Sequence, residues 1–489
     1  NFTENANPCV DLWQGINCTF NDINQEYHIV ELKLDAYNLR GGLPKAISTF
    51  PELRKLSLNS NIINGSLPSE IGNLTQLEEL SIYSNQLSGS LPETICALNN
   101  LQHFSFYSNN LDGKIPRDIG NLNALKYLSG YDNFLTGRLP RSLFQLPNLT
   151  MLDFHENLLK GSIPSEISNL TLLTKFDIGN CAFKSSIPES IGSLSELRYL
   201  SLLGNLLTGT IPETMSQLAH LEQLLLNYNK LKGTIPLALC QLSEIRKLNL
   251  FNNMLTGTIP AGIGNLTKLN NLGLNTNRLH GTIPASLGRC TSLVRVYLNE
   301  NLLSGTIPES LGSLKKIEYF NVYINRLTGT IPSFLGSQNA LTDLGLDNNN
   351  FYGTVPATIG NLSALHSLYL SNNALTHTLP AELGNLNLLE GLFLVGNQFS
   401  GTIPSFLNSL ANLRDIEMGN NLFTGTLPTE IGDLKLLQFV YFNGQFIFGT
   451  IPPSFANLVR LQYLSLSDNM LTGTIPRNFA QLTILREMQ

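Results

Sequence analysis

The side chains with the most reactive chemistry in this chain are His155 and the carboxylates beside it, Asp153 and Glu156. A histidine between carboxylates suits a metal site or an acid–base pair, because imidazole and carboxylate groups bind metals and carry protons. Asp132 and Asp177 belong to the same acidic cluster. No third ligand at metal spacing, nucleophile motif or phosphate-binding loop accompanies them. We therefore expect a solvated polar face that has no catalytic, metal or cofactor role, in a protein that is not an enzyme.

The element that positions these residues is a repeat of 24 residues. A proline closes the repeat at Pro44 and recurs at every 24th position through Pro476, in all 19 expected places. Seven residues before that proline, 16 of the 19 units carry Asn, and the exceptions are Tyr37, Cys181 and Gln445. A fixed period of this length without insertions predicts a solenoid, in which each unit buries its leucines against the next.

Each unit contains two short extended segments. The pattern L-x-x-L-x-L before the Asn, as in the unit of Asn61, alternates and predicts a short strand. The Asn amide suits hydrogen bonds to neighbouring backbone groups, so we expect a ladder of these bonds where the chain leaves the strand. Glycine lies four residues after the Asn in 17 units, with Ser185 and His377 in the other two. We expect this glycine to allow tight packing before the proline.

The unit L-x-x-L-x-L-x-x-N-x-L-x-G-x-I-P-x-x-(I/L)-G-x-L resembles the plant-type extracellular leucine-rich repeat. Such repeats occur in plant receptor-kinase ectodomains and polygalacturonase-inhibiting proteins, and related repeats occur in algal and protist surface proteins. The resemblance covers roughly residues 30–489. It implies an α/β-type leucine-rich-repeat solenoid of 19 repeats, a curved superhelix. Its short parallel strands line the concave face, 3-10 or helical turns connect them, and a second short sheet lies behind.

Residues 1–29 resemble the N-terminal cap of this family. Cys9 and Cys18 flank the only tryptophan, Trp13, and the resemblance implies a Cys9–Cys18 disulfide that shields the first repeat. The remaining cysteines are two or more repeats apart, too far for a disulfide, so we expect buried free thiols. These are Cys96, Cys181, Cys240 and Cys290. The array, residues 30–489, stops inside a twentieth repeat without a C-terminal cap, and we expect the natural protein to continue.

Several features predict a secreted or cell-surface protein. The chain begins without Met, so we expect that a secretory signal has been removed. Glycosylation sequons together with a disulfide indicate an extracellular glycoprotein. The sequon residues are Asn1, Asn17, Asn64, Asn73, Asn148, Asn169, Asn265 and Asn361. No run approaches the roughly 18–20 apolar residues that span a bilayer, so we expect no membrane span.

The outward positions of the main strand are six, four, two and one residues before the Asn. Twelve of the chain's 15 tyrosines fall on them, as do 13 Asp or Glu against five Lys or Arg. Aromatics suit strands in any case, and acids maintain solubility. Exposed tyrosines also anchor protein and sugar partners, whereas an acidic face disfavours nucleic acid. The ligand-binding candidates are Tyr83, Tyr107, Tyr127, Tyr131, Asp132, Asp153, His155, Glu156, Tyr297, Tyr319, Tyr323, Asp343, Asp347 and Tyr369.

A second face carries the threonines of the phrase LTGTIP, which point outward if the leucine and isoleucine point inward. The second of these threonines occurs in 12 consecutive units, from Thr210 to Thr474. Thr is a good exposed strand residue, and duplication of the repeat accounts for the column. The alternatives are lateral self-association and ice binding. The self-association candidates are Thr210, Thr234, Thr258, Thr282, Thr306 and Thr330.

The leading hypothesis is an extracellular recognition module, similar to a receptor ectodomain. It would bind a peptide, protein or glycan through the concave Tyr/Asp-rich face, with a homo-oligomer or a co-receptor as further partners. The alternative is a structural or adhesive cell-surface protein that self-assembles through its repeated columns, which the repeat without insertions favours. Inhibition of a hydrolase and ice binding are minor alternatives. The sequence does not name the ligand.

Overall fold

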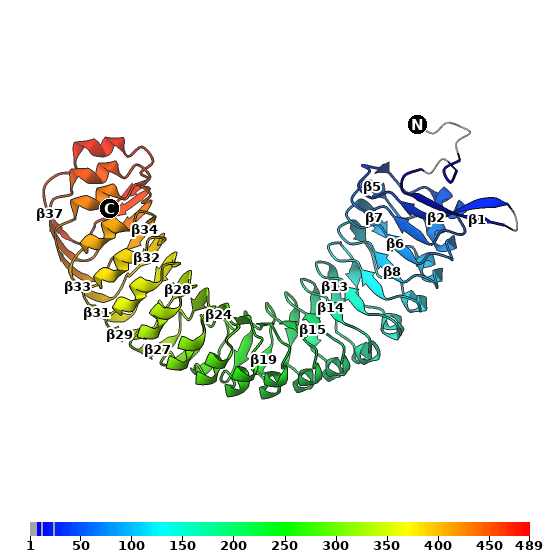
Figure 1. Cartoon of the computed structure of the whole chain (residues 1–489), viewed down its shortest axis with the longest axis horizontal. Coiled ribbons are helices and arrows are strands. Elements are labelled where there is room, and N and C mark those ends of the chain that lie inside the picture. Colours follow the sequence, from blue (N-terminus) through cyan, green and yellow to red (C-terminus); the bar gives the residue numbers. More distant parts are fainter. Residues whose placement is uncertain (1–6, 11–12, 23–24) are drawn as a thin grey trace. The chain divides into compact units, whose positions relative to one another are not determined.

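The computed structural model describes residues 7–10, 13–22 and 25–489, in two compact units, Asn1–Ile245 and Arg246–Gln489. In both units the chain forms successive coils of 24 residues, so the predicted repeat solenoid is confirmed. Each coil contains a main strand, a second short strand and a 3-10 helix, and the described part of the chain has no α-helix. In the second unit, main strands such as β32 (Gly391–Phe393) and second strands such as β33 (Gln398–Thr402) lie on opposite sides (Figure 1).

The main strands pair in parallel, with a register of 24 residues from one coil to the next, as in Leu80↔Phe104. A slip by one residue would turn every buried leucine to the solvent face, so the leucine pattern fixes this register. In the first unit the main strands are β2 (Glu26–Lys33), β4 (Lys55–Ser57), β6 (Glu79–Ser81), β8 (His103–Ser105), β10 (Tyr127–Ser129), β12 (Met151–Asp153), β14 (Lys175–Asp177), β16 (Tyr199–Ser201) and β18 (Gln223–Leu225). In the second unit they are β20 (Lys247–Asn249), β22 (Asn271–Gly273), β24 (Arg295–Tyr297), β26 (Tyr319–Asn321), β28 (Asp343–Gly345), β30 (Ser367–Tyr369), β32, β34 (Asp415–Glu417), β36 (Phe439–Tyr441), β38 (Tyr463–Ser465) and β40 (Glu487–Met488).

The second strands also pair in parallel, but with a register of 22 residues, as in Thr402↔Thr424. In the first unit they are β3 (Arg40–Gly41), β5 (Ile62–Gly65), β7 (Gln86–Ser90), β9 (Asn110–Asp112), β11 (Thr136–Gly137), β13 (Leu158–Gly161), β15 (Ala182–Ser186), β17 (Leu206–Thr208) and β19 (Lys232–Thr234). In the second unit they are β21 (Met254–Thr256), β23 (His280–Thr282), β25 (Leu302–Gly305), β27 (Arg326–Gly329), β29 (Asn350–Gly353), β31 (Ala374–His377), β33, β35 (Leu422–Gly425), β37 (Phe446–Gly449) and β39 (Met470–Leu471).

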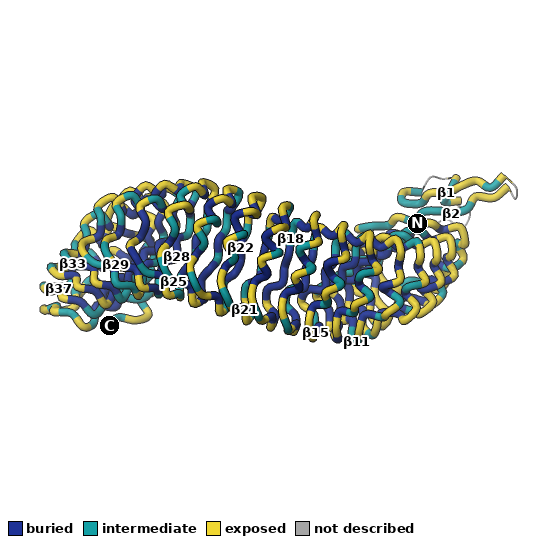
Figure 2. The backbone as a smooth tube through the Cα atoms, turned by 90° about the horizontal axis from the view of Figure 1, so that it is seen from below, coloured by how far each residue is buried: buried dark blue, intermediate teal, exposed yellow. Residues whose placement is uncertain are grey.

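A 3-10 helix follows the proline of each repeat. The five-residue helices begin directly after that proline, from η1 (Lys45–Thr49) to η19 (Arg477–Gln481), and only η4 (Ile119–Asn121) is shorter and begins later. Proline suits the residue before a helical turn, because its ring fixes φ and it needs no N–H partner. The leucines, isoleucines and phenylalanines of all three elements form the core, and Figure 2 shows buried backbone along the middle of the coils.

The predicted asparagine ladder is confirmed. The Asn205 side-chain amide donates to the carbonyl oxygens of Ile178 at 2.9 Å and Leu202 at 3.1 Å, and its Oδ1 accepts the N–H of Phe183 at 2.9 Å. The bonds to Ile178 and Phe183 tie the coil to the one before it, in addition to backbone bonds between the same coils such as Asn180 N–H to the Leu203 carbonyl at 2.8 Å. The same bonds recur at other Asn positions in both units.

The exceptions to the ladder are weaker. The Cys181 thiol donates to the carbonyl of Phe154 at 3.5 Å. Gln445 donates to Met418 at 2.9 Å, but its side-chain oxygen has no partner among the described residues.

Cys96, Cys240 and Cys290 are buried free thiols as predicted, but the prediction of burial is wrong for Cys181, which is half-buried. A thiol is smaller than the amide that the site accommodates, so it leaves part of the position open.

The repeated glycine of the second strand has a packing reason. Its φ lies in the left-handed region, +77° at Gly281, and a Cβ there would meet the Thr258 γ-methyl group at 2.8 Å. At Gly233 and at Gly305, the methyl group of the equivalent threonine in the preceding coil lies against the glycine in the same way. The threonine column therefore covers a row of glycines, and its side chains remain exposed as predicted.

The N-terminal segment joins the array through a shared strand. β1 (Ile16–Asn21) pairs antiparallel with β2, and β2 pairs in parallel with β4. Because β2 spans residues 26–33, the predicted boundary between cap and array after residue 29 falls inside this strand. Cys9 and Cys18 form a disulfide with Cα atoms 5.6 Å apart. No helix of the described segments is long and apolar enough to cross a lipid bilayer.

Candidate functional site

Four rings form an aromatic ladder on the main sheet of the first unit: Tyr83, Tyr107, Tyr131 and His155. Successive ring centroids lie 4.2, 4.3 and 4.3 Å apart, with interplanar angles of 9°, 9° and 12°. Each ring comes from the position two residues before the Asn. Equivalent positions on parallel strands are about 4.8 Å apart, so planar side chains in this column stack face to face. The four half-buried rings therefore form one continuous stack along the sheet, which carries three tyrosine hydroxyls.

Tyr127 lies beside this ladder in a second column, where its ring stacks on His103 with centroids 4.7 Å apart. It comes from the position six residues before the Asn. The column arrangement expected from the repeat is thus present in the structure for all five of the first unit's ring candidates.

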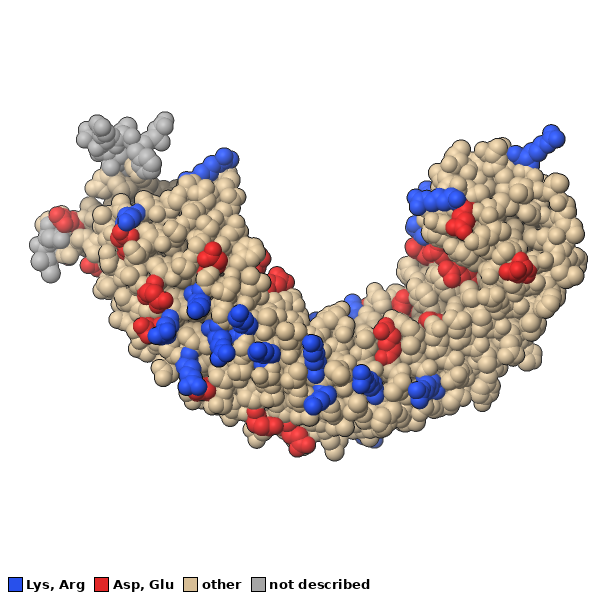
Figure 3. All heavy atoms as spheres, turned by 180° about the vertical axis from the view of Figure 1, so that it is seen from behind, with Lys and Arg blue, Asp and Glu red and all other residues tan. Residues whose placement is uncertain are grey.

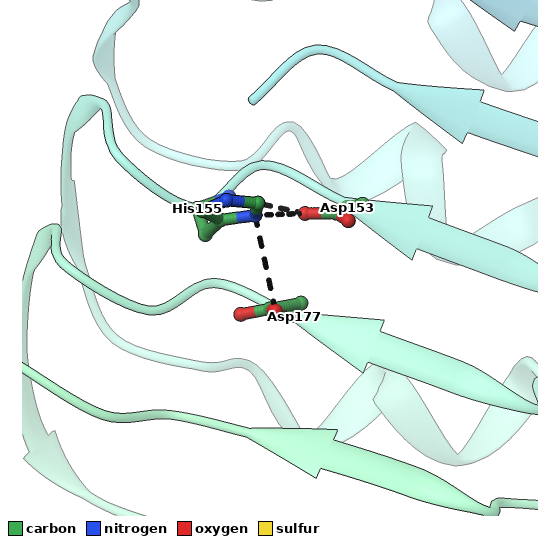
Figure 4. Close-up of side chains that lie close together, drawn as sticks. All are labelled: Asp153, His155 and Asp177. Carbon is green, nitrogen blue, oxygen red and sulfur yellow. Dashed lines mark hydrogen bonds and ion pairs between the residues drawn. The ribbon is translucent and has the colours of Figure 1, made fainter. Parts of the chain in front are cut away.

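The ladder ends in a charged cluster made by β12, β14 and the residues that follow β12. His155 Nδ1 lies 2.6 Å from Asp153 Oδ1 and 3.8 Å from Asp177 Oδ2 (Figure 4). On the other side, Lys175 Nζ lies 2.7 Å from Asp153 Oδ2. Lys175 also lies over the ring of Tyr199, 5.2 Å from its centroid. Asp153 is therefore held between two cationic partners.

The expectation of a solvated acidic cluster is wrong for two of its members. Asp153 is 1 % exposed and Asp177 is 5 % exposed. Both occupy the position four residues before the Asn, where larger side chains of the flanking columns and of neighbouring strands cover a short side chain. Asp132 and Glu156 are exposed as predicted, because the backbone enters the left-handed region there, with φ of 53° at each, and turns away from the sheet.

Burial and pairing have opposite effects on these groups. Burial alone would raise the pKa of Asp153, but hydrogen bonds from His155 and Lys175 outweigh it and hold that pKa below its usual value. Burial alone would lower the pKa of His155, but the hydrogen bond to Asp153 and the nearby carboxylates raise it. Burial, together with the charge of Asp153, raises the pKa of Asp177. The cluster thus favours an ionised Asp153 beside a protonated His155.

By ligand type, Asp153, His155 and Asp177 suit a metal ion, since one donor atom from each lies within 4.8 Å of the others. Asp177 is a third potential ligand that was not predicted from the sequence. However, the Lys175 ammonium group and the His155 ring already satisfy Asp153. The donors bind one another, so the arrangement is a charge-compensated cluster. Lys175 was not predicted to be a partner of Asp153. It lies on the strand that follows Asp153's strand, at the outward position next to Asp177.

The candidates of the second unit form looser groups. Tyr297 and Tyr319 are tilted by 41° with centroids 6.3 Å apart, and the Arg295 guanidinium lies 5.3 Å from the Tyr319 ring centre. Tyr369 stacks on Phe393 with centroids 4.6 Å apart. The second unit therefore has short aromatic contacts but no described stack as long as the aromatic ladder.

Two acids of the second unit's main-sheet face, Asp343 and Asp347, have no cationic partner among the described residues. Asp343 and Asp347 are half-buried, and the Asn348 amide donates to Asp347 at 2.6 Å. Burial raises the pKa of Asp343 and of Asp347. The pKa of nearby Tyr323 is raised by burial and by the charges of Glu300 and the two aspartates. These carboxylates therefore lack the compensation that Asp153 has.

The remaining sequence candidates lie on other surfaces. Seven sequon residues are exposed, and Asn1 lies outside the described residues. The six threonines proposed for self-association are also exposed.

The fold and the ladder of asparagines define a leucine-rich-repeat solenoid, and comparison with known families agrees. The model described as "Leucine-rich repeat region" matches residues 31–152 and 175–334, and "Leucine rich repeat" matches residues 339–399. A further leucine-rich-repeat model matches residues 148–170 and 460–482. The chain belongs to the leucine-rich repeat family.

Among solved structures, the chain is similar to plant receptors. It is 32% identical to the plant peptide hormone receptor RGFR1, solved in complex with RGF2, with a TM-score of 0.91 over 98% of this chain and 82% of that one. A TDR receptor is 31% identical, with a TM-score of 0.87 over 92% and 82%. The Arabidopsis receptor kinase HAESA, in complex with the peptide hormone IDA and the co-receptor SERK1, is 29% identical, with a TM-score of 0.75 over 98% and 88%. No curated protein sequence matches the chain.

Proposed function

We propose that this chain is an extracellular recognition module that binds a peptide or protein through the main-sheet face of its first unit. The aromatic ladder carries this proposal. Four stacked rings at 4.2–4.3 Å form a rigid row of edges and hydroxyl groups, which suits contact with an extended ligand. RGFR1 and HAESA, two proteins to which the chain is similar, were solved with peptide hormones.

The charge beside the aromatic ladder favours a ligand with a basic group. Asp132 and Glu156 are exposed at the end of the ladder, whereas Asp153 is occupied by Lys175 and His155. A lysine or arginine of the ligand would therefore bind the two exposed acids without removing the internal partners of the buried one. An extracellular location agrees with the exposed sequons and with the HAESA structure described as an ectodomain.

The threonine column no longer supports the self-assembly hypothesis, which leaves the repeat without insertions as the observation in its favour. The threonine methyl groups cover the glycines of the next coil, as Thr258 covers Gly281, which accounts for the threonine column without a partner molecule. Ice binding drew on the same column and is not proposed either.

The test is a selection of random peptides on the purified chain, followed by calorimetric titration of the selected peptides. We expect basic residues among the selected peptides and a loss of binding in Tyr107→Ala and in Asp132→Asn with Glu156→Gln. The matched control is Tyr463→Ala on the main sheet of the second unit, which should leave binding unchanged. If no peptide binds saturably, or if the control weakens binding as much as Tyr107→Ala does, the proposal is wrong.

A further inference from the structure

Basic side chains gather on one face of the first unit (Figure 3). There, the second strands β11 and β13 border a groove of about 620 Å³, and five exposed cationic residues line it. We call it the basic groove, and its cations are Lys114, Arg117, Arg138, Arg141 and Lys160. The described residues that line it include neither an acidic side chain nor an aromatic ring.

The fold places like charges side by side in this groove. β11 pairs with β13 in parallel, with Gly137 opposite Leu159, so the next residues in that register are Arg138 and Lys160. The Arg138 stem also lies across Gly161, where an added Cβ would meet its Cγ at 2.9 Å. Like charges on neighbouring strands destabilise a sheet, and nothing in the repeat requires them.

The second unit shows what the repeat uses where no charge is needed. At β25 and β27, for example, the pair equivalent to Arg138 and Lys160 is Thr306 and Thr328. The aliphatic stem of Arg138 covers a glycine, as the Thr258 methyl group does, and in addition holds a guanidinium at the surface. The positive charge is therefore an addition to a packing role that threonine fills alone.

The cations of the basic groove are mostly without internal partners. Within the described residues, Arg141 alone among the five has an ion pair, to Glu166 at 3.7 Å, and its side chain is 87% exposed. An unneutralised row of cations attracts an anionic ligand, and several binding cations along neighbouring strands favour a polymer over a single small anion.

We propose that the basic groove binds an acidic polysaccharide, a linear glycan that carries a carboxylate or sulfate on most of its sugars. Arginine and lysine bind these groups through charge-assisted hydrogen bonds. The Thr136 hydroxyl within the groove donates to the Gly113 carbonyl at 2.8 Å and can still accept a hydrogen bond from a sugar hydroxyl. Single-stranded nucleic acid is the less suitable polyanion, because its binding sites use aromatic rings to stack bases and the groove has none.

The test uses a fluorescently labelled oligogalacturonate as the probe, with binding followed by anisotropy over a salt series. The variant is Arg138→Thr with Lys160→Thr, because threonine occupies the position of Arg138 throughout the second unit and the position of Lys160 in half of its repeats, so the fold should tolerate it. We expect its affinity to fall by roughly tenfold or more, since each charge-assisted hydrogen bond contributes about that factor, and the salt dependence to become shallower. The matched control is Arg278→Gln with Arg326→Gln, which removes two exposed charges of the second unit, one shortly before β23 and one at the start of β27, and should bind as the wild type does.

Three further arms identify the ligand chemistry. The methyl-esterified oligomer should not bind, because it lacks the charge. A sulfated dextran that binds would extend the ligand class to sulfate esters within the same proposal. The proposal is overturned if oligogalacturonate does not bind at low salt, if the control variant loses as much affinity as the groove variant, or if an oligothymidylate competes as well as the glycan does.

Discussion

The two units use the same repeat but treat acidic residues on the main sheet in opposite ways. In the first unit, Asp153 is almost fully buried and has Lys175 at 2.7 Å and His155 at 2.6 Å. In the second unit, Asp343 and Asp347 are half-buried with no cation beside them among the described residues. An acid deep in the sheet needs partners, whereas an acid nearer the surface can retain some water.

This difference separates a structural cluster from surfaces that remain open to a ligand. The side chains of the first unit's cluster satisfy one another, so its exposed neighbours Asp132 and Glu156 are the groups that remain for binding. In the second unit, Asp343 and Asp347 have no cation beside them among the described residues, and the aromatic contacts of that unit's face are looser.

Removal of the buried charge should break the comparison most clearly. Asp153→Asn should lower the free energy of unfolding of the first unit by about 3 kcal/mol, because it separates a buried ion pair and leaves its partners uncompensated. Hydrogen exchange measured on β12 and β14 would report the loss locally.

The matched control is Asp343→Asn in the second unit, which removes a partly desolvated charge that has no cationic partner. We expect β28 to retain or gain protection. Equal losses in the two units would show that pairing does not distinguish them.

Strong acidification should change the two units in opposite directions. The lowered pKa of Asp153 means that its stabilisation is present above the usual carboxylate pKa and is lost as pH falls through the lowered value. The raised pKa values of Asp343 and Asp347 have the reverse sign, with stabilisation at low pH that is lost as pH rises through the raised values. The raised pKa values of His155 and Asp177 add stability to the first unit as pH falls from neutral, so the loss from Asp153 begins only below the usual Asp pKa of about 4, where β12 should lose protection from exchange relative to β28. A uniform response along the chain, after correction for intrinsic exchange rates, would contradict this.

The smallest effect concerns the one position in each unit where the repeat departs from its glycine. Ser185 and His377 have φ of 78° and 69°, which glycine adopts without strain. Ser185→Gly should stabilise the first unit by about 0.5–1 kcal/mol, since relief of strain exceeds the entropy cost of glycine. His377→Gly should gain less stability, because His377 Nδ1 lies 2.8 Å from the Thr376 hydroxyl and this contact would be lost.

Thermal unfolding would measure both substitutions, with Ser186→Gly as a control that should destabilise the protein. Destabilisation by Ser185→Gly would disprove the argument from strain.

The sequence by itself determined the period, the register of the main sheet, the asparagine ladder and the columns in which rings stack. It did so because every unit must bury its leucines against the next unit. Residues at the same repeat position, such as Tyr83, Tyr107 and Tyr131, therefore lie on neighbouring strands. The confirmed elements all follow from local alternation repeated without an insertion.

Only the tertiary structure decided how deep each outward position lies. Alternation places Asp153 and Asp132 on the same face, but the flanking columns bury the first, and a left-handed backbone turns the second to the solvent. The 22-residue register of the second strands likewise brings Arg138 level with Lys160, which the 24-residue period does not reveal. The depth of an outward position depends on the neighbouring coils, and the stagger of the second strands depends on how far the chain advances between the two strands of a coil. Both are properties of the packed coils and not of a single repeat.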